Sequence, residues 1–290
     1  MRLVTHRLNG HHALGVLDDA SVLCLPAGWP DSMLGLIDGG PMLLERLKSA
    51  LPQLRREARR VVLKDVELAA PIPRPRKNVM CLGLNYRDHA EESARAKGTP
   101  AVIPEHPIVF TKNVTSVNGP NGVIPAQPGV TSELDWEVEL GVVIGTGGRA
   151  IAREHALKHV FGYTVINDVS ARDLQFRHKQ FFLGKSLDGA CPMGPVIVTR
   201  DELPDPQNLR LQCRVNGELK QDSNTRDMIF DVATIVSVLS QGMKLEPGDL
   251  IATGTPAGVG FARVPPQYLR SGDVVECEIE HIGRLRNRVV

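Results

Sequence analysis

The chain has 290 residues, of which 42% are hydrophobic and 23% charged, as is typical of a globular protein with a sizeable core. Its 34 basic and 33 acidic residues nearly cancel, which argues against a surface built mainly for nucleic acid. The sequence shows five cysteines without a CxxC pair, no signal-peptide pattern and no membrane-spanning run. We therefore predict a cytoplasmic protein with no nucleic-acid or membrane partner.

The first 70 residues are predicted to form a small α/β domain. Short strand-like runs precede leucines at helical spacing, and Pro52 is expected to end or kink that helix. The segment APIPRPRKN (70–78) then carries three closely spaced prolines, which favour an extended connector. The predicted domains therefore span residues 1–70 and 71–290.

The second region is predicted to be rich in strands. Apolar runs separated by Gly, Pro and Asn recur along it. Helices are expected only at 86–97 and near 152–160, 170–180 and 229–241. The regular alternation of strand and helix that a doubly wound parallel sheet requires is missing. The predicted fold class is therefore α+β and strand-rich.

The run ELDWEVELGVVIG (133–145) places Asp135, Glu137 and Glu139 on one face of an expected strand. Neighbouring carboxylates on that face are about 6.6 Å apart, so they need either bulk water or a cation. The run DVVECEIEHIG (273–283) shows the same alternation of acids and apolar residues. Spacing alone leaves a solvated acidic face and a cation site open for both runs.

The segment GLNYRDHAEE (83–92) is predicted to begin a helix, with Asn85 as its N-cap. His89 and Glu92 are then neighbours at i, i+3. A carboxylate in that position can accept the imidazole N–H and raise the basicity of the ring, as a general base requires. The same spacing also fits an ion pair at the surface, and the residues alone leave both interpretations open.

The segment INDVSARDLQ (166–175) places Asp168 at the end of an expected strand. Ser170 is the expected cap of a following helix that carries Arg172 and Gln175 on one face. An acid between a strand and a helix either ligates a metal or caps the helix, and the pattern fits both.

Two glycine-containing segments offer further polar side chains. Lys185 lies between glycines in FFLGKSLDG, where its backbone can approach a ligand, and lysine near a metal suits a carboxylate or a developing enolate. The loop ATGTPAGVG (252–260) presents Thr255 and lacks the residue order of a phosphate-binding loop. A nucleotide site in this loop is therefore disfavoured.

Taken in order, these segments resemble the fumarylacetoacetate hydrolase family over about residues 80–289. The matching segments are GLNYRDHAEE, PIVFTK, DWEVELGVVIG, NDVSARDLQ, GKSLDGACPMGP, NGELKQ, ATGTPAGVG and GDVVECEIEHIGRLRNRV. Leu82 stands where the tyrosine-pathway enzyme of that family has an additional metal-binding aspartate. The chain therefore looks most like the shorter acylpyruvase-type and 2-hydroxyhepta-2,4-diene-1,7-dioate isomerase-like bacterial members.

The resemblance implies a mixed β-sandwich roll with few helices, a homodimer, and a site for Mg2+ or Mn2+. The implied metal ligands are Glu137, Glu139 and Asp168, with Asp135 beside them. The implied catalytic residues are His89, Glu92 and Lys185. The implied substrate-binding residues are Arg172, Gln175 and Thr255.

The activity that the resemblance implies is metal-dependent hydrolysis of a C–C bond. The substrate expected is a 2,4-dioxo acid like an acylpyruvate or fumarylpyruvate, as in aromatic catabolism, and the products are pyruvate and a carboxylic acid. The alternative is an oxaloacetate decarboxylase, or a 2-hydroxydienedioate isomerase or decarboxylase, that uses the same site. A non-catalytic β-rich module with a structural metal would dispense with His89 and Glu92, and both are present.

Overall fold

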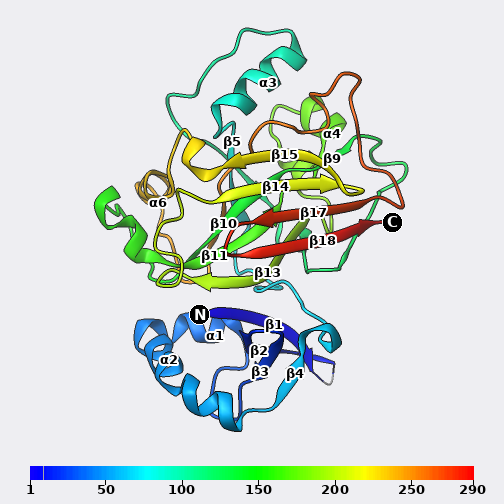
Figure 1. Cartoon of the computed structure of the whole chain (residues 1–290). Coiled ribbons are helices and arrows are strands. Elements are labelled where there is room, and N and C mark those ends of the chain that lie inside the picture. The colour runs from blue at the N-terminus through cyan, green and yellow to red at the C-terminus, as the bar shows by residue number, and fades with distance from the viewer. Residues whose placement is uncertain (9) are drawn as a thin grey trace.

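The computed structural model describes residues 1–8 and 10–290, whose strands form three sheets (Figure 1). The largest sheet has eleven strands in the order β4-β3-β2-β1-β13-β11-β10-β16-β5-β6, with β7 beside β13. A second sheet has the order β15-β14-β17-β18-β8, and β9 pairs with β12. Within the described residues, most neighbouring strands are antiparallel. The predicted strand-rich α+β fold is confirmed.

The N-terminal region contributes β1 (Arg2–Leu8), β2 (His11–Asp18), β3 (Ser21–Cys24), α1 (Met33–Asp38), α2 (Gly40–Glu57), β4 (Arg60–Val62) and η1 (Leu63–Asp65). The other strands of the large sheet are β5 (Val79–Gly83), β6 (Ile108–Lys112), β7 (Val117–Asn118), β10 (Val138–Ile144), β11 (Val160–Asn167), β13 (Cys191–Thr199) and β16 (Leu250–Ala252).

The five-stranded sheet consists of β8 (Val123–Ile124), β14 (Arg210–Val215), β15 (Glu218–Asn224), β17 (Val274–Ile279) and β18 (Gly283–Val289). The short pair is β9 (Leu134–Asp135) and β12 (Ser170–Ala171). The remaining helices are α3 (Arg87–Lys97), α4 (Arg172–Arg177), α5 (Phe182–Lys185) and α6 (Val232–Ser240), with 3₁₀ turns η2 (Val114–Ser116), η3 (Arg153–His159) and η4 (Thr225–Asp227).

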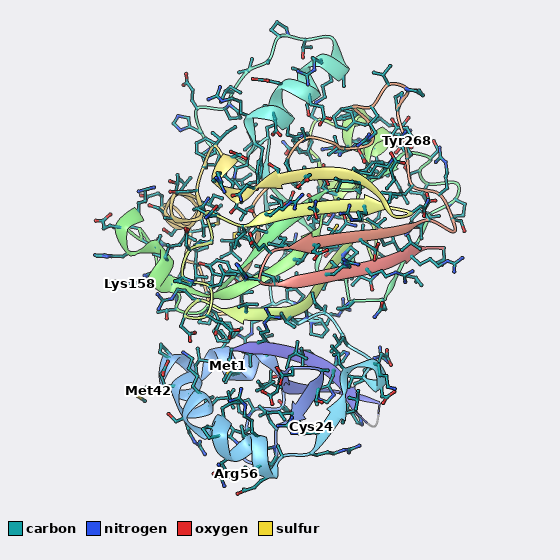
Figure 2. The ribbon with its side chains drawn as sticks, viewed as in Figure 1. Met1, Cys24, Met42, Arg56, Lys158 and Tyr268 are labelled. Carbon is teal, nitrogen blue, oxygen red and sulfur yellow. The ribbon has the colours of Figure 1, made fainter. Side chains whose placement is uncertain are left out.

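The N-terminal region is joined to the rest by backbone pairing. Strand β1 runs antiparallel to β13, with Arg2 opposite Val198 and Leu3 opposite Ile197 (Figure 1). The large sheet therefore continues across the predicted boundary near residue 70, and the division into two domains stays a prediction. Figure 2 shows Met42 and Arg56 on this N-terminal part, with Tyr268 at the opposite end of the molecule.

Several helix predictions need correction. Of the two outcomes expected at Pro52, an end or a kink, the first is wrong, because helix α2 continues to Glu57. The stretch near 152–160 forms the 3₁₀ turn η3, and the helix expected at 170–180 is limited to the six residues of α4. Among the described residues, no helix has the length and apolar character needed to cross a membrane.

Strand β10 positions the candidate site. It lies between β11 and β16, and all seven of its residues are buried. Val138, Leu140 and Val142 belong to the main hydrophobic cluster, which also receives Trp136. Because successive side chains of a strand point to opposite faces, the glutamates at alternate positions point away from this cluster, into another part of the interior.

Candidate metal centre and cavity

Three carboxylates meet at the end of the β10–β11 pair. The strands are antiparallel with Val138 opposite Asn167, and the Asp168 N–H donates to the Glu137 carbonyl at 2.9 Å. This register brings Asp168 beside Glu137 and Glu139, with one carboxylate oxygen from each within 4.8 Å of the others. All three residues are buried. The three predicted metal ligands are thus brought together.

The Glu139 carboxylate is only partly satisfied by the protein. Its Oε2 accepts a hydrogen bond from the Gly254 N–H at 2.8 Å, while its Oε1 is buried without a partner among the described residues. Burial is the main cause that raises the pKa of Glu139, and the charges of Asp168 and Glu137 raise it further. An unpaired buried carboxylate is costly, so a cation among these oxygens would stabilise the site. Hard oxygen donors of this kind fit Mg2+ or Mn2+.

Glu137 has a different environment from Glu139. Burial acts to raise its pKa, but the charges of Lys185 and Arg172 outweigh this and lower the pKa of Glu137 to about 2. Lys185 Nζ lies 2.7 Å from Glu137 Oε2 and 2.8 Å from Asp168 Oδ2. Arg172 approaches Glu137 Oε1 at 2.7 Å. Glu137 is therefore held as a carboxylate.

Lys185 reaches the carboxylates because α5 packs closely on α4. A Cβ at Gly184 would lie 2.5 Å from the Gln175 backbone nitrogen and 2.7 Å from the Ala171 carbonyl oxygen. Only glycine permits this approach. The sequence suggested that the glycines bring the backbone near a ligand; instead, Gly184 allows two helices to pack.

Lys112 is a buried cation that the sequence interpretation missed. Its Nζ lies 2.6 Å from Asp168 Oδ1 and 3.0 Å from the Val169 carbonyl oxygen. Asp168 thus contacts one lysine through each carboxylate oxygen. Lys112 ends an apolar strand, a position where a lysine is usually solvated, so its sequence gave no signal of this role.

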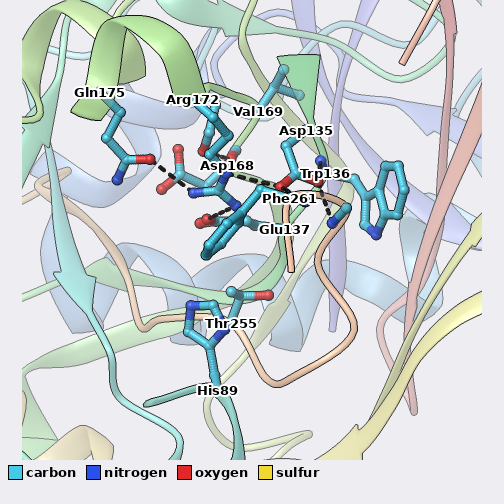
Figure 3. Close-up of polar contacts among 12 residues, drawn as sticks. His89, Asp135, Trp136, Glu137, Asp168, Val169, Arg172, Gln175, Thr255 and Phe261 are labelled. Carbon is cyan, nitrogen blue, oxygen red and sulfur yellow. Dashed lines mark hydrogen bonds and ion pairs between the residues drawn. The ribbon is translucent and has the colours of Figure 1, made fainter. Parts of the chain in front are cut away.

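Asp135 lies outside the three-carboxylate group and organises Arg172 and a loop (Figure 3). Its Oδ2 accepts from Arg172 Nε at 2.8 Å and from the Phe261 N–H at 3.0 Å. Its Oδ1 accepts from the Gly260 N–H at 2.6 Å. Arg172 in turn donates to Gln175 Oε1 at 2.9 Å. Asp135 therefore fixes the guanidinium that contacts Glu137.

His89 and Glu92 lie on α3, as the sequence predicted. His89 Nδ1 is 3.5 Å from Glu92 Oε2, beyond a good hydrogen bond but within ion-pair range. Both Glu92 carboxylate oxygens accept from the Gly258 N–H at 3.0 Å. A side chain at Gly258 would meet the Lys220 carbonyl oxygen, since a Cβ there would lie 2.1 Å from it. Figure 3 shows His89 next to Thr255 and facing Glu137.

Two predicted caps have other roles. The α3 N-cap is Tyr86, and the Asn85 side chain instead holds two loops, through Phe230 and the Thr253 carbonyl oxygen at 2.7 Å. The α4 N-cap is Ala171, and Ser170 Oγ donates to the Asp168 carbonyl at 2.9 Å. Both side chains are buried. Asn85 bonds to distant loops, whereas Ser170 bonds to the backbone two residues before it and not to the start of the helix.

The Thr255 hydroxyl is anchored on both sides. It donates to the Val138 carbonyl oxygen at 2.9 Å and accepts from Gln221 Nε2 at 2.8 Å. Gln221, a residue of β15, also accepts from the Val138 N–H at 3.0 Å. This buried glutamine links the second sheet to the site, and the sequence had indicated it only as part of the NGELKQ segment.

These side chains line a cavity of about 70 Å³, which has room for a few water molecules or a small ligand group. Its polar lining from the predicted set is His89, Glu137, Arg172, Gln175, Lys185 and Thr255. Aromatic rings, including Phe110, Phe176 and Phe261, form much of the rest. The arrangement combines a cluster of three carboxylates suited to a hard cation, one of which reaches the cavity, with fixed positive charges and a histidine.

Comparison with known proteins places this chain in a family. The sequence profile "Fumarylacetoacetate (FAA) hydrolase C-terminal" matches residues 78–290. The Bacillus subtilis protein "Oxaloacetate tautomerase YisK" is 53% identical over 227 residues, which cover 78% of this chain and 74% of that protein. The human mitochondrial oxaloacetate tautomerase FAHD2A is 42% identical over 305 residues, covering 100% of this chain and 92% of that protein.

A solved structure with bound metal has the same fold. The maleylpyruvate hydrolase of Sphingobium sp. SYK-6, in complex with manganese(II) and pyruvate, is 32% identical with a TM-score of 0.78. The match covers 100% of this chain and 99% of that one. This likeness and the buried carboxylate group together support a divalent-metal site in this chain.

Proposed function

The chain belongs to the fumarylacetoacetate hydrolase family of enzymes, and we propose that it is a metal-dependent oxaloacetate tautomerase that interconverts the enol and keto forms of oxaloacetate. The observation that carries this proposal is the 53% identity to a protein named for that activity. The C–C hydrolysis expected from the family resemblance is less well supported, and the alternative based on oxaloacetate fits better. Hydrolysis stays as a second candidate because the manganese-containing relative is a hydrolase.

We assign the metal to Glu137, Glu139 and Asp168, whose carboxylate oxygens converge. One of these oxygens, Glu139 Oε1, has no hydrogen-bond partner among the described residues. When bound there, Mg2+ or Mn2+ would act as a Lewis acid toward the carboxylate and keto oxygens of a 2-oxo acid. Lys185 and Arg172 already neutralise Glu137, and Lys112 neutralises Asp168. These cations compensate the carboxylates and leave the site able to accept an anionic substrate.

In this proposal His89 moves the proton at C3 of oxaloacetate. Its Nδ1 faces Glu92, so its Nε2 is the ring nitrogen available to the substrate. In the keto-forming direction Nε2 delivers a proton to C3 while the enol oxygen releases its proton to water. The enol-forming direction reverses both transfers. Glu92, fixed by the Gly258 N–H, orients the imidazole.

The remaining cavity side chains hold the substrate in this proposal. Lys185 places positive charge near the keto oxygen, where negative charge develops as the proton leaves C3. Arg172 and Gln175, which hydrogen-bond to each other, present donors to a carboxylate. Thr255 is fixed by Val138 and Gln221 and sets the position of the wall beside His89.

The test is the rate at which enol-oxaloacetate becomes the keto form. Malate dehydrogenase accepts the keto form, so NADH oxidation reports its appearance in the presence of purified enzyme and Mg2+ or Mn2+. A His89→Gln variant keeps a polar side chain of similar size but removes the imidazole ring. We expect acceleration by the native protein and a loss of about 100-fold or more in the variant.

The same samples separate the competing activities. Pyruvate from oxaloacetate, followed with lactate dehydrogenase, would identify a decarboxylase. Pyruvate from acetylpyruvate would identify C–C hydrolysis. If the native protein fails to accelerate keto formation above the spontaneous rate, the tautomerase proposal is wrong. The predicted homodimer and cytoplasmic location stay predictions.

A further inference from the structure

Helix α3 presents a row of polar side chains to the cavity beyond His89. His89, Ser93 and Lys97 follow one another at i, i+4 and i+8, so they share one face of the helix. All three line the cavity. His89 and Ser93 are buried, and Lys97 is in the exposed last turn. The row therefore runs from the candidate proton-transfer site to the mouth of the cavity.

Lys97 differs from the other cations of the cavity because no carboxylate neutralises it. Arg172 and Lys185 each contact Glu137 at 2.7 Å. Within residues 1–8 and 10–290, Lys97 has neither a salt bridge nor a hydrogen bond to a protein acceptor. Its Nζ lies 4.8 Å from the centre of the Phe176 ring. Its ammonium is thus held beside the cavity with its charge available to a ligand.

The electrostatic environment of Lys97 favours an anion. Although Lys97 is exposed at the helix end, partial desolvation of its ammonium is the main cause that lowers the pKa of Lys97, and the positive charge of Arg172 lowers it further. An anionic group bound beside the ammonium would favour its charged form and so offset both effects. The oxygen of Ser93, one turn earlier on the same helix face, supplies a hydroxyl donor at the same wall.

Two aromatic rings lie between the positive charges of Lys97 and Arg172. Phe176 and Phe261 pack edge to face with ring centres 5.3 Å apart. Lys97 lies over Phe176, and Arg172 lies 4.6 Å over Phe261. The cavity therefore has a positive group at each end of an aromatic pair. A substrate with a carboxylate at each end matches this arrangement better than one with a single carboxylate.

We propose that Lys97, assisted by Ser93, binds the distal carboxylate of a dicarboxylic 2-oxo acid and so selects dicarboxylates over monocarboxylates. The choice of oxaloacetate as the dicarboxylate rests on the proposed function. A charge-assisted hydrogen bond of this kind is worth about 10- to 100-fold in affinity. The selection depends on charge at the far end of the substrate and leaves the metal-binding end unchanged.

The experiment compares two ligands that differ only at the distal group. Oxaloacetate carries a carboxylate where 2-oxobutyrate carries a methyl group. Calorimetric titration of the Mn2+-loaded protein would give the affinity for each ligand, and the rate of keto formation would be measured in parallel. The variants are Lys97→Met, which keeps the aliphatic stem, and Lys97→Arg, which keeps the charge. Arg95→Met is the matched control, since this exposed cation on the same helix does not line the cavity.

We expect Lys97→Met to weaken oxaloacetate binding about 10- to 100-fold and 2-oxobutyrate binding less than about 2-fold. Lys97→Arg should retain most of the preference, and Arg95→Met should change neither affinity. An unchanged preference in Lys97→Met, or an equal loss for both ligands, would overturn the inference. Binding without tautomerisation by the native protein would contradict the proposed function alone, because the ligand preference would still be measured.

Discussion

Two parts of this chain, β9–β10 and β17, carry the same alternation of acidic and apolar residues in opposite surroundings. Glu137 and Glu139 are buried, as is Asp135 just before them. In β17 the alternating residues are half-exposed and buried in turn, and Glu278 pairs with Arg284 at 2.9 Å on the exposed side. The first acids meet in the interior, and the second remain at the surface.

The difference comes from what covers each strand. Glu137, on the acidic face of β9–β10, meets Arg172 and Lys185 from α4 and α5. Lys112 from β6 pairs with the adjoining Asp168. The acids of β17 face solvent and the arginines of β18. Because alternation states only which residues share a face, it does not specify whether that face is covered. The comparison shows that buried acids become a site when separate elements supply their counter-charges.

The largest expected effect is a loss of stability when a buried ion pair is broken, compared with the loss when an exposed pair is broken. Arg172→Met leaves Asp135 and Glu137 buried without their guanidinium, so the free energy of unfolding should fall by about 3–5 kcal/mol. Arg284→Met removes an exposed pair and should cost no more than about 1 kcal/mol. Urea unfolding of both variants would measure the two values. Similar losses would show that burial does not separate the regions.

The second prediction compares the rate of keto formation when one acid in each region is replaced. Glu137→Ala removes a candidate metal ligand that also holds Lys185, so keto formation should slow more than about 100-fold. Glu278→Ala should change the rate less than about 2-fold. Both variants would be assayed with the malate dehydrogenase coupling and increasing Mn2+. Full activity of Glu137→Ala at ordinary Mn2+ concentrations would remove this residue from the metal site.

The smallest of these effects is stabilisation by metal. Mn2+ at 100 times its Kd should stabilise the native protein by about 2.7 kcal/mol. The melting temperature should therefore rise by about 5–10 °C relative to a sample in EDTA. Glu139→Gln should lose most of this rise, whereas Glu276→Gln should retain it. An undiminished rise in Glu139→Gln would mean that the metal binds elsewhere.

The sequence predicted the general fold and most of the candidate site, because both depend on recurrent local signals. Alternation indicated the strands, and the ordered motifs indicated His89, Glu137 and Asp168. In the structure His89 and Glu137 line one cavity, and Asp168 meets Glu137 in the carboxylate cluster. Cap predictions were wrong at Asn85 and Ser170, since both side chains bond to distant or buried backbone groups. At Asn85 the cap rule failed because it considers only neighbours in sequence.

Residues that act through long-range contacts were missed. Lys112, Gln221 and Gly258 each contact a predicted site residue far away in the sequence. Nothing in their local patterns distinguishes them from a solvated lysine, a surface glutamine or a loop glycine. Their roles appear only when the strands and loops that carry them are placed side by side.

The sequence by itself determined which residue types were present and which of them shared a strand or helix face, because backbone periodicity is local. It therefore determined the acidic row of β9–β10 and the His89–Glu92 pair. Only the tertiary structure decided that Lys112, Arg172 and Lys185 neutralise Asp168 and Glu137, and that Lys97 remains unneutralised beside the cavity. The physical reason is that burial and charge pairing depend on elements that are distant in sequence and meet only in the folded chain.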